Sequence, residues 1–289
     1  MPSLIDIRRR IRSVKNMQQI TKAMKMVSAA KLRRAQERAL QSRPYAEMMG
    51  RVLSNVAAAA AGNEAAARLP LLQVREEKRI QLVVVGSDGG LAGGFNSNLF
   101  RRAQRFVDEH GSAELAVEAI GRKARDYFRR RNFRITGEHT DITDKPTLEK
   151  GREIANKLIE VYSKAEVDAV YIAVNEFKSV MAPNIVLRKI LPVEVPEGES
   201  GEPIDYIYEQ PPEELLGALL PRYIEMSIYR AMLESNSAYQ AARMTAMDTA
   251  SSNAGDVIQD LTLNLNRVRQ AAITREIIEI VSGAAAAVG

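Results

Sequence analysis

The sequence has no cysteine and no tryptophan, and only 5% of its 289 residues are aromatic. Without cysteine the chain can form no disulfide, and it has neither a thiol nucleophile nor a thiolate ligand for a metal. The scarcity of aromatic side chains favours helices packed through alanine, leucine and methionine. No apolar run approaches the roughly 20 residues that a membrane-spanning helix needs, and the start of the chain lacks the apolar core of a signal peptide. These absences together favour a cytoplasmic protein.

Residues for catalysis or metal binding are also scarce. The two histidines, His110 and His139, lie in polar stretches, so we expect both at the surface. A metal site would need a histidine with carboxylates, and no such spacing stands out. Neither a serine–histidine–aspartate arrangement nor a pair of catalytic carboxylates can be argued from spacing. The histidines and the spacing of the carboxylates thus give no reason to expect a metal site or a catalytic site built on them.

The positive charge of the chain is concentrated at its N-terminal end. Residues 1–45 hold 12 lysines and arginines against 2 acidic residues, whereas the whole chain has a net charge of only +5. An excess of this kind needs an acidic partner, which could be phosphate, anionic lipid or an acidic protein surface.

Residues 3–41 predict a long helix. Ser3 followed by Asp6 resembles a capping box. The span 3–43 would be roughly 60 Å long at ~1.5 Å per residue, and Pro44 should kink or interrupt the helix. Apolar residues recur at steps of three and four, which predicts the narrow seam of a coiled coil: Leu4, Ile7, Ile11, Val14, Met17, Ile20, Met24 and Val27.

A second long helix is predicted near the C-terminus. It should begin near residue 211 and break or kink at Pro221. Residues 222–285 contain no proline and would reach roughly 95 Å. Coiled-coil spacing is kept by Ile258, Leu261, Leu265, Val268 and Ala272, and is continued one residue out of phase by Ile273, Ile277, Ile280 and Ala284. The simplest partner for each narrow stripe is the other long helix, in an antiparallel pair.

The middle of the chain alternates strands and helices, which is typical of an α/β sheet with helices on its faces. We expect a Rossmann-like α/β body plus a long antiparallel coiled coil of the N- and C-terminal helices, divided into segments 1–70, 71–210 and 211–289. Strands are predicted at 79–85, 115–120, 133–136 and 167–174, helices at 97–108, 122–131 and 148–163, and a hairpin-like pair at 185–191 and 206–208, with a solvated loop at 196–203.

Two features leave alternatives open. The glycines of residues 86–94 follow a strand and precede a helix, as phosphate-binding loops do, but they match neither the P-loop nor the GxGxxG spacing. A tight turn, a nucleotide site and an interface loop all remain as interpretations. The basic first helix is compatible with a solvated face, with nucleic-acid binding, although base-reading motifs are absent, or with an acidic protein partner.

Three stretches give the chain a close resemblance, over its whole length, to the gamma subunit of bacterial F-type ATP synthases. They are residues 5–45, residues 87–96 (Ser-Asp-Gly-Gly-Leu-Ala-Gly-Gly-Phe-Asn) and residues 269–284 (Arg-Gln-Ala-Ala-Ile-Thr-Arg-Glu-Ile-Ile-Glu-Ile-Val-Ser-Gly-Ala). The third is the most specific. At Gly89 the family pattern often has a basic residue, so a side-chain contact there does not carry over. The cysteine-bearing insertion of the chloroplast form is absent.

The resemblance implies a central-stalk rotor of a proton-translocating ATP synthase, which couples ion flow through the membrane ring to ATP synthesis and hydrolysis and takes part in regulating ATPase activity. Its implied partners are the alpha and beta subunits of the catalytic head, the epsilon subunit and the c-ring. ATP, ADP and Mg²⁺ would bind on partners, and this chain would have no catalytic residue. The implied location is the cytoplasmic side of the bacterial cell membrane, as a peripheral protein.

The resemblance also implies two sets of interface residues. Lys22, Met24 and Lys25, with Arg243 on the facing helix, should lie near an acidic lever of the beta subunit. Arg269, Gln270, Thr274 and Glu276 should contact a beta-subunit loop near the end of the shaft. The competing hypotheses are a coiled-coil protein that organises nucleic acid, based on the basic helix, and a nucleotide-dependent enzyme, based on the glycine turn.

Overall fold

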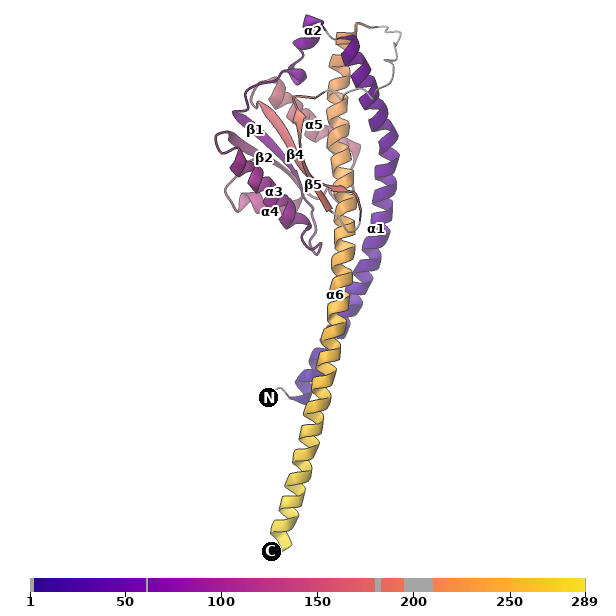
Figure 1. The fold of residues 1–289 in the computed structure, drawn as a ribbon, viewed down its shortest axis with the longest axis vertical. Helices are drawn as coiled ribbons and strands as arrows, with labels where there is room; N and C mark the ends of the chain where they lie inside the picture. Colours follow the sequence, from indigo (N-terminus) through magenta and orange to yellow (C-terminus); the bar gives the residue numbers. More distant parts are fainter. Residues whose placement is uncertain (1–2, 61, 180–182, 195–209, 289) are drawn as a thin grey trace. The chain divides into compact units, whose positions relative to one another are not determined.

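The computed structural model describes residues 3–60, 62–179, 183–194 and 210–288. Its central element is a five-stranded sheet with the strand order β3-β2-β1-β4-β5. The first four strands are parallel, and β5 pairs antiparallel with β4 at one edge (Figure 1). The elements in chain order are α1 (Leu4–Ala59), α2 (Glu64–Ala67), η1 (Pro70–Leu72), β1 (Arg79–Val85), α3 (Phe95–Glu109), β2 (Glu114–Ile120), α4 (Arg122–Arg129), β3 (Arg134–His139), α5 (Leu148–Ser163), β4 (Ala169–Phe177), β5 (Pro183–Leu191) and α6 (Pro212–Val288).

Helices cover both faces of the sheet, because successive residues of its buried strands point to opposite sides. On β1, Leu82 and Val84 pack with α3 and α4, in a cluster that includes Leu99 and Phe128. The alternate residues Val83 and Val85 pack on the other side, in a cluster formed with α5 and with segments of α1 and α6. The Rossmann-like body predicted from the alternating pattern is confirmed.

Two prolines lie inside the long helices without ending them. Pro44 lies within α1, and Pro221 lies within α6. The expectation was that each proline would either kink or interrupt its helix; an interruption is wrong, whereas a kink stays a prediction. A proline removes one backbone hydrogen bond, but tertiary packing supplies most of a helix's stability. Around Pro221 the side chains of Leu216, Leu220 and Ile224 are all buried in the body's core.

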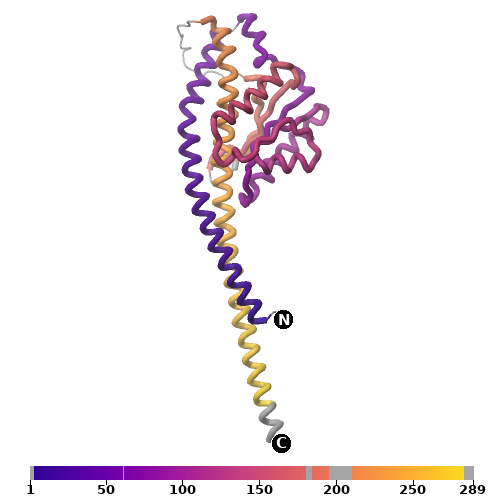
Figure 2. Tube along the Cα trace, turned by 180° about the vertical axis from the view of Figure 1, so that it is seen from behind, coloured from indigo at the N-terminus to yellow at the C-terminus, as the bar shows by residue number. Residues whose placement is uncertain are grey.

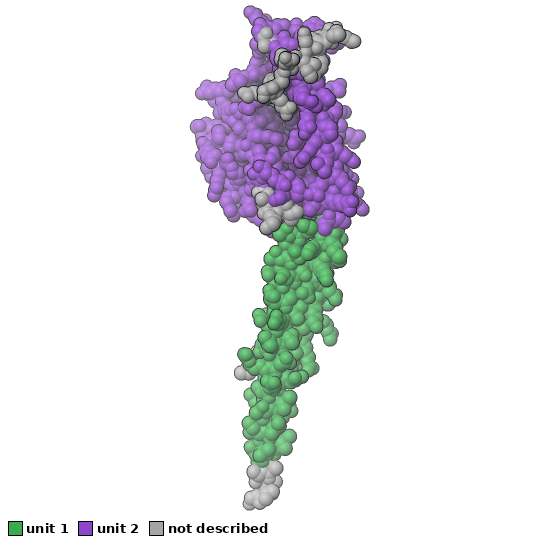
Figure 3. Space-filling view, turned by 45° about the vertical axis from the view of Figure 1, so that its right-hand side comes forward, with its two compact units in different colours: residues 1–28, 244–289 green, residues 29–243 purple. Residues whose placement is uncertain are grey.

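The chain divides into two compact units, coloured separately in Figure 3. Unit 1 comprises residues 1–28 and 244–289, and unit 2 comprises residues 29–243. Both long helices contribute to both units, and within each unit their segments run antiparallel (Figures 1 and 2). The two units are defined by the contacts within each of them. The predicted segments 1–70, 71–210 and 211–289 follow the order of elements along the chain instead, so the division into these three segments stays a prediction.

The buried face of α1 follows the predicted seam as far as Val14 and departs from it at three later positions. Met17, Ile20 and Val27 are exposed, whereas Thr21 and Ser28 are buried. The predicted seam is therefore wrong at these three positions, whereas Met24 is partly buried as predicted. The buried positions still follow the heptad period, but small polar residues occupy them, so a search for apolar side chains selects the neighbouring stripe.

Most strand and helix predictions of the body match to within a few residues. The segment 185–191 is part of β5, but its partner in the sheet is β4, with Ile172 opposite Arg188. The predicted hairpin-like pairing with 206–208 and the loop at 196–203 lie outside the described residues. The seam positions Ile258, Leu261, Leu265, Val268 and Ala272 are all partly buried, whereas Ile273, Ile277 and Ile280 are exposed.

Candidate functional site

The glycine-rich segment between β1 and α3 is a turn whose polar groups bond to one another. The Asn96 side-chain nitrogen donates to the Ser87 hydroxyl at 2.9 Å. That hydroxyl donates in turn to the carbonyl of Gly89 at 2.8 Å. These contacts fold the loop back on the first turn of α3.

Asp88 holds the same loop to the two segments beside it. Its carboxylate accepts hydrogen bonds from the backbone N–H groups of Arg122, Asp141 and Thr143, each at 2.9 Å, and from the Thr143 hydroxyl at 2.6 Å. Burial alone would raise the pKa of Asp88, but these hydrogen bonds outweigh it and hold the pKa below its ordinary value. The negative charge of this carboxylate would repel a phosphate at the turn, which argues against the nucleotide-site interpretation.

The loop docks on α6 through Tyr239. The tyrosine hydroxyl donates to the Gly90 carbonyl at 3.2 Å, and its ring meets Phe95 edge-to-face with 5.5 Å between centroids. A Cβ atom at Gly89 would lie closer to the Tyr239 hydroxyl than real contacts allow, and 3.3 Å from its Cζ. Glycine at position 89 is therefore what lets the Tyr239 hydroxyl reach the loop.

Two further side chains of α6 bond to the body just before Tyr239. The hydroxyl of Ser235 donates to the carbonyl of Val85, the last residue of β1, at 3.2 Å. The side-chain nitrogen of Asn236 donates to the carbonyl of Thr143 at 2.6 Å. Both bonds are buried, where an unpaired carbonyl would be costly. We refer to Ser235, Asn236 and Tyr239, with the carbonyls they bind, as the polar clamp.

The polar clamp was missed by the sequence analysis, which treated α6 as a helix with one apolar stripe. Its signal is the run 235–240 (Ser-Asn-Ser-Ala-Tyr-Gln), in which every residue is buried although four of the six are serine, asparagine or glutamine. Four uncharged polar residues in one helical stretch mark a helix that packs against backbone groups. A search for apolar residues at helical spacing counts only apolar side chains, so it does not detect this run.

A buried carboxylate lies on β2, next to the edge strand β3. The side chain of Glu118 on β2 is fully buried. Its oxygens contact His139 Nε2 at 2.7 Å, Lys157 Nζ at 3.0 and 3.1 Å, and the Thr136 hydroxyl at 2.8 Å. Burial would raise the pKa of Glu118, but the hydrogen bonds from His139 and Lys157 outweigh it and lower the pKa. His139 is only 14% exposed, so the expectation of a surface histidine is wrong there.

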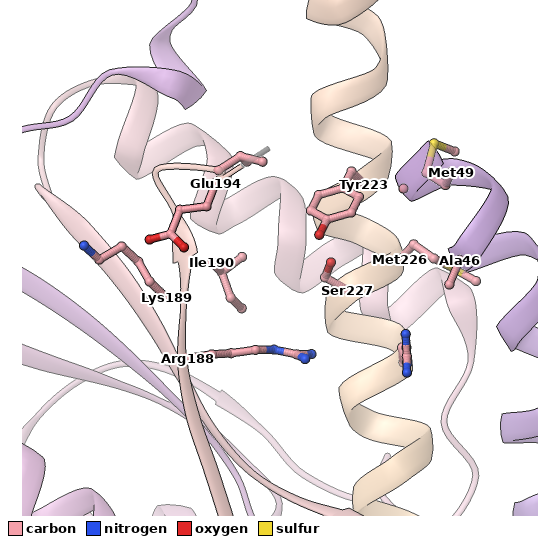
Figure 4. Close-up of a pocket in the computed structure, with 12 residues that line it drawn as sticks. Ala46, Met49, Arg188, Lys189, Ile190, Glu194, Tyr223, Met226 and Ser227 are labelled. Carbon is pink, nitrogen blue, oxygen red and sulfur yellow. The ribbon is translucent and has the colours of Figure 1, made fainter. Parts of the chain in front are cut away.

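A cavity of about 590 Å³ lies in unit 2 between the edge strand β5 and the two long helices (Figure 4). Arg188 of β5 points across it towards α6. Its cationic side chains already have acidic partners: Arg188 lies 3.5 Å from Glu176, Lys189 2.7 Å from Glu77, and Arg230 2.9 Å from Glu234. Because these charges are matched, the cavity offers little attraction for an anion and presents no catalytic arrangement.

The first predicted interface set lies in both units. In unit 1, Lys22 is exposed, and Met24 and Lys25 are partly exposed. Lys25 Nζ forms an ion pair with Asp248 Oδ1 at 2.6 Å, which joins the two helix segments of that unit. In unit 2, Arg243 is partly exposed, and its buried Nε has no hydrogen-bond partner among the described residues. Whether these residues meet another subunit stays a prediction.

The second predicted set lies on the C-terminal part of α6. Arg269, Gln270, Thr274 and Glu276 are all exposed. The Thr274 hydroxyl donates to the Gln270 carbonyl one turn earlier at 2.9 Å, so these two residues share one side of the helix. Their side chains are available to a partner, and that role also stays a prediction.

Searches of the described residues for other kinds of site are negative. They contain no group of three or more histidine, cysteine, aspartate or glutamate side chains placed to hold a metal ion. Within the same described ranges, no helix is both long and apolar enough to cross a membrane.

Comparison with known proteins gives a consistent result along the whole chain. Residues 3–287 match the protein family described as ATP synthase. The ATP synthase gamma chain of Solibacter usitatus is 58% identical over 287 residues, which cover 99% of this chain and 100% of that protein. The gamma chain of Pelotomaculum thermopropionicum is 49% identical over 99% of both chains. The chain belongs to the ATP synthase gamma chain family.

Solved structures with the same fold include parts of mitochondrial ATP synthases whose sequences differ widely from this one. The rotor of Euglena gracilis mitochondrial ATP synthase aligns with this gamma chain at a TM-score of 0.65 with 16% identity, over 93% of this chain and 98% of that one. The central stalk of the Tetrahymena thermophila mitochondrial enzyme aligns at 0.60 with 23% identity, over 80% and 99%. At such identities these likenesses concern the fold, and they agree with the sheet and the long terminal helices described above.

Proposed function

We propose that this gamma chain is the central-stalk rotor of a proton-translocating ATP synthase and has no catalytic residue of its own. Its partners are then the alpha and beta subunits of the catalytic head, the epsilon subunit and the c-ring. ATP, ADP and Mg²⁺ bind on those partners. The chain would work as a peripheral protein at the cytoplasmic side of the bacterial cell membrane.

One observation supports this proposal most directly. The long helices leave a surface that suits contact with other subunits: Met17, Ile20, Ile277 and Ile280 are exposed on helices of 56 and 77 residues. Large exposed apolar side chains mark interaction surfaces. The polar clamp supplies the complementary feature, since a rotor must hold its body firmly to its own helix.

The test is reconstitution with alpha and beta subunits. Complexes prepared with and without this chain are compared by size-exclusion mass and by ATPase rate. The proposal expects one copy of the chain in a large complex, and a turnover that depends on it. A chain that elutes alone and leaves the ATPase rate unchanged would contradict the proposal, and salt-sensitive retention on DNA would then favour the nucleic-acid hypothesis.

A second test addresses the end of α6. We expect Gln270→Ala to lower ATPase turnover while assembly stays intact, because a hydrogen bond that forms in one rotary state and breaks in the next changes the relative energies of the states, whereas the many other contacts of the chain hold the complex together. The measurement is turnover per purified complex. Equal turnover in the variant and the parent would remove Gln270 from the proposed interface.

A further inference from the structure

The glycine-rich turn after β1 contains a dipeptide with a reactivity of its own. Asp88 is followed by Gly89, and it is the one aspartate or asparagine of the sequence whose next residue is glycine. In such a pair the backbone nitrogen of the glycine can attack the aspartate carboxyl group, because glycine has no Cβ to obstruct the approach and lets the backbone turn freely. Aspartates that precede glycine are therefore the ones most prone to isomerise.

The isomerisation has two steps and needs no reactant other than water. In the first step the Gly89 nitrogen forms a bond to Cγ of Asp88, and the carboxyl OH leaves with the proton of that nitrogen as water, which closes a five-membered succinimide ring. In the second step water adds to one of the two ring carbonyls. Addition at Cγ restores aspartate, whereas addition at the backbone carbonyl carbon of residue 88 gives isoaspartate, in which the main chain runs through Cβ and Cγ.

The structure holds the Asp88 carboxylate in a form that cannot start this reaction. Oδ1 accepts from the N–H groups of Arg122 and Asp141, and Oδ2 accepts from the N–H and the hydroxyl of Thr143. Ring closure removes one of these oxygens, so it breaks at least two of the four bonds. Although burial alone would raise the pKa of Asp88, the hydrogen bonds lower it below its ordinary value, which disfavours the protonated carboxyl that the first step requires.

The backbone on both sides of the reacting bond is fixed as well. The N–H of Asp88 donates to the Thr143 hydroxyl at 2.9 Å, and the carbonyl of Gly90 accepts from the Tyr239 hydroxyl at 3.2 Å. Between them Gly89 is so close to Tyr239 that even a Cβ atom would not fit. The attacking nitrogen belongs to this fixed segment, so the loop must open before the ring can form.

We propose that Asp88 is a site of spontaneous isomerisation to isoaspartate, and that the contacts of the closed loop suppress this modification in folded unit 2. The reaction then proceeds at the rate of the free chain multiplied by the fraction of time that the loop is open, as hydrogen exchange of a protected amide does. The contacts that suppress it all lie within unit 2, so the proposal does not depend on the proposed rotor function.

The modification also prevents the loop from closing again. Isoaspartate lengthens the main chain by one carbon between residue 88 and Gly89, and it leaves the carboxylate directly on Cα. A carboxylate on this shorter branch cannot reach the same four donors while Gly89 keeps its close approach to Tyr239. We therefore expect modified chains to unfold at a lower temperature than unmodified ones.

The test follows isoaspartate at Asp88 in the purified full chain, either folded or unfolded in guanidinium chloride, at one mildly acidic pH and one temperature. Trypsin releases residues 80–101 as a peptide with a single aspartate, and electron-transfer fragmentation distinguishes isoaspartate from aspartate in it. Isoaspartate should form at least about tenfold more slowly in the folded chain. In the unfolded chain, Gly89→Ala should slow its formation at least about threefold, because the methyl group hinders the attacking nitrogen.

Substitutions at Thr143 test the geometry in the folded chain. Thr143→Val keeps the shape of the side chain but removes the hydroxyl that bonds to the carboxylate and the N–H of Asp88, so isoaspartate should form at least about threefold faster. Thr143→Ser keeps a hydroxyl and should behave like the parent. The matched control is Thr249→Val on an exposed part of α6 in unit 1, where the hydroxyl donates to the Thr245 carbonyl. This control should leave the rate at Asp88 unchanged.

Equal rates in the folded and unfolded parent would overturn the proposal, as would an unfolded parent that isomerises no faster at Asp88 than at its other aspartates. A folded Thr143→Val chain that matches Thr249→Val would overturn it too, because the bonds to Asp88 would then give no protection. Tyrosine fluorescence shows whether each variant is folded. If Thr143→Val does not fold, Asn236→Ala replaces it, because it loosens the same segment by removing the bond to the Thr143 carbonyl, and the same acceleration is expected.

Discussion

Gly89→Ala should destabilise unit 2, because the new methyl group would collide with the Tyr239 hydroxyl. Overpacking of this kind costs about 1–3 kcal/mol. Moving the tyrosine also breaks its hydrogen bond to the Gly90 carbonyl, at about 1 kcal/mol. Alanine restricts the unfolded chain more than glycine, which offsets about 0.4–1 kcal/mol. The collision and the lost bond outweigh this gain, so we expect a net loss of about 2 kcal/mol.

A second substitution separates the collision from other effects of alanine. Tyr239→Phe removes the hydroxyl and should cost about 1 kcal/mol through the lost hydrogen bond. In that background Gly89→Ala meets only the ring carbon at 3.3 Å, so its own cost should fall below about 1 kcal/mol. The double variant should then be more stable than the sum of the single losses predicts, by at least about 1 kcal/mol.

The chain provides a selective probe for this measurement. It has no tryptophan, and all nine tyrosines lie between residues 45 and 239, within unit 2. Urea unfolding followed by tyrosine fluorescence therefore reports unit 2 alone. In thermal unfolding, the Tm of a unit of this size falls by ~2–4 °C per kcal/mol, so the Gly89→Ala loss corresponds to a fall in Tm of roughly 4–8 °C. Additive losses in the double variant would refute the proposed contact between position 89 and the hydroxyl.

Three further predictions concern the other contacts. Glu118→Gln should cost about 3 kcal/mol at neutral pH. Because the folded-state pKa of Glu118 is lowered, its stabilisation is present above the ordinary carboxyl pKa and is lost as the pH falls through the folded value, so the stabilities of parent and variant in urea unfolding should converge as the pH is lowered. Asn236→Ala should cost about 1–3 kcal/mol by leaving the Thr143 carbonyl unpaired, whereas the exposed control Asn156→Ala should be near neutral by the same assay. Lys25→Ala should cost under about 1 kcal/mol, because its ion pair is 41% and 58% exposed; circular dichroism on heating measures this, and a much larger loss would mean that the pair is structural.

The sequence was most informative where one physical effect dominates. The buried strand β1 was predicted because its β-branched residues leave no alternative, and α5 was predicted at its observed bounds. Thr147 caps α5 by accepting a hydrogen bond from the Lys150 N–H, which is the local signal that defines a helix start. Elements whose bounds depend on local chemistry and periodicity could therefore be predicted from the sequence.

The errors occurred where polar residues are buried and apolar ones are exposed. Thr21 and Ser28 occupy the seam of α1, while Met17 and Ile20 face outward. His139 reaches inward to Glu118, a pairing between neighbouring strands that no spacing in the sequence reveals. The polar clamp was missed for the same reason. Tertiary partners decide these positions, and in the outward-facing cases the partners belong to other subunits if the proposed function is right.

On the proposed function, one energetic argument explains both the buried polar residues and the exposed apolar residues. The clamp must resist force along defined directions, and buried hydrogen bonds to backbone carbonyls are directional and costly to break. The outer faces must exchange contacts repeatedly, and exposed apolar residues and screened ion pairs such as Lys25–Asp248 are individually weak. A rotor needs both properties in one chain. Strong bonds therefore belong between α6 and the body of the same chain, and weak ones on the surfaces that other subunits pass.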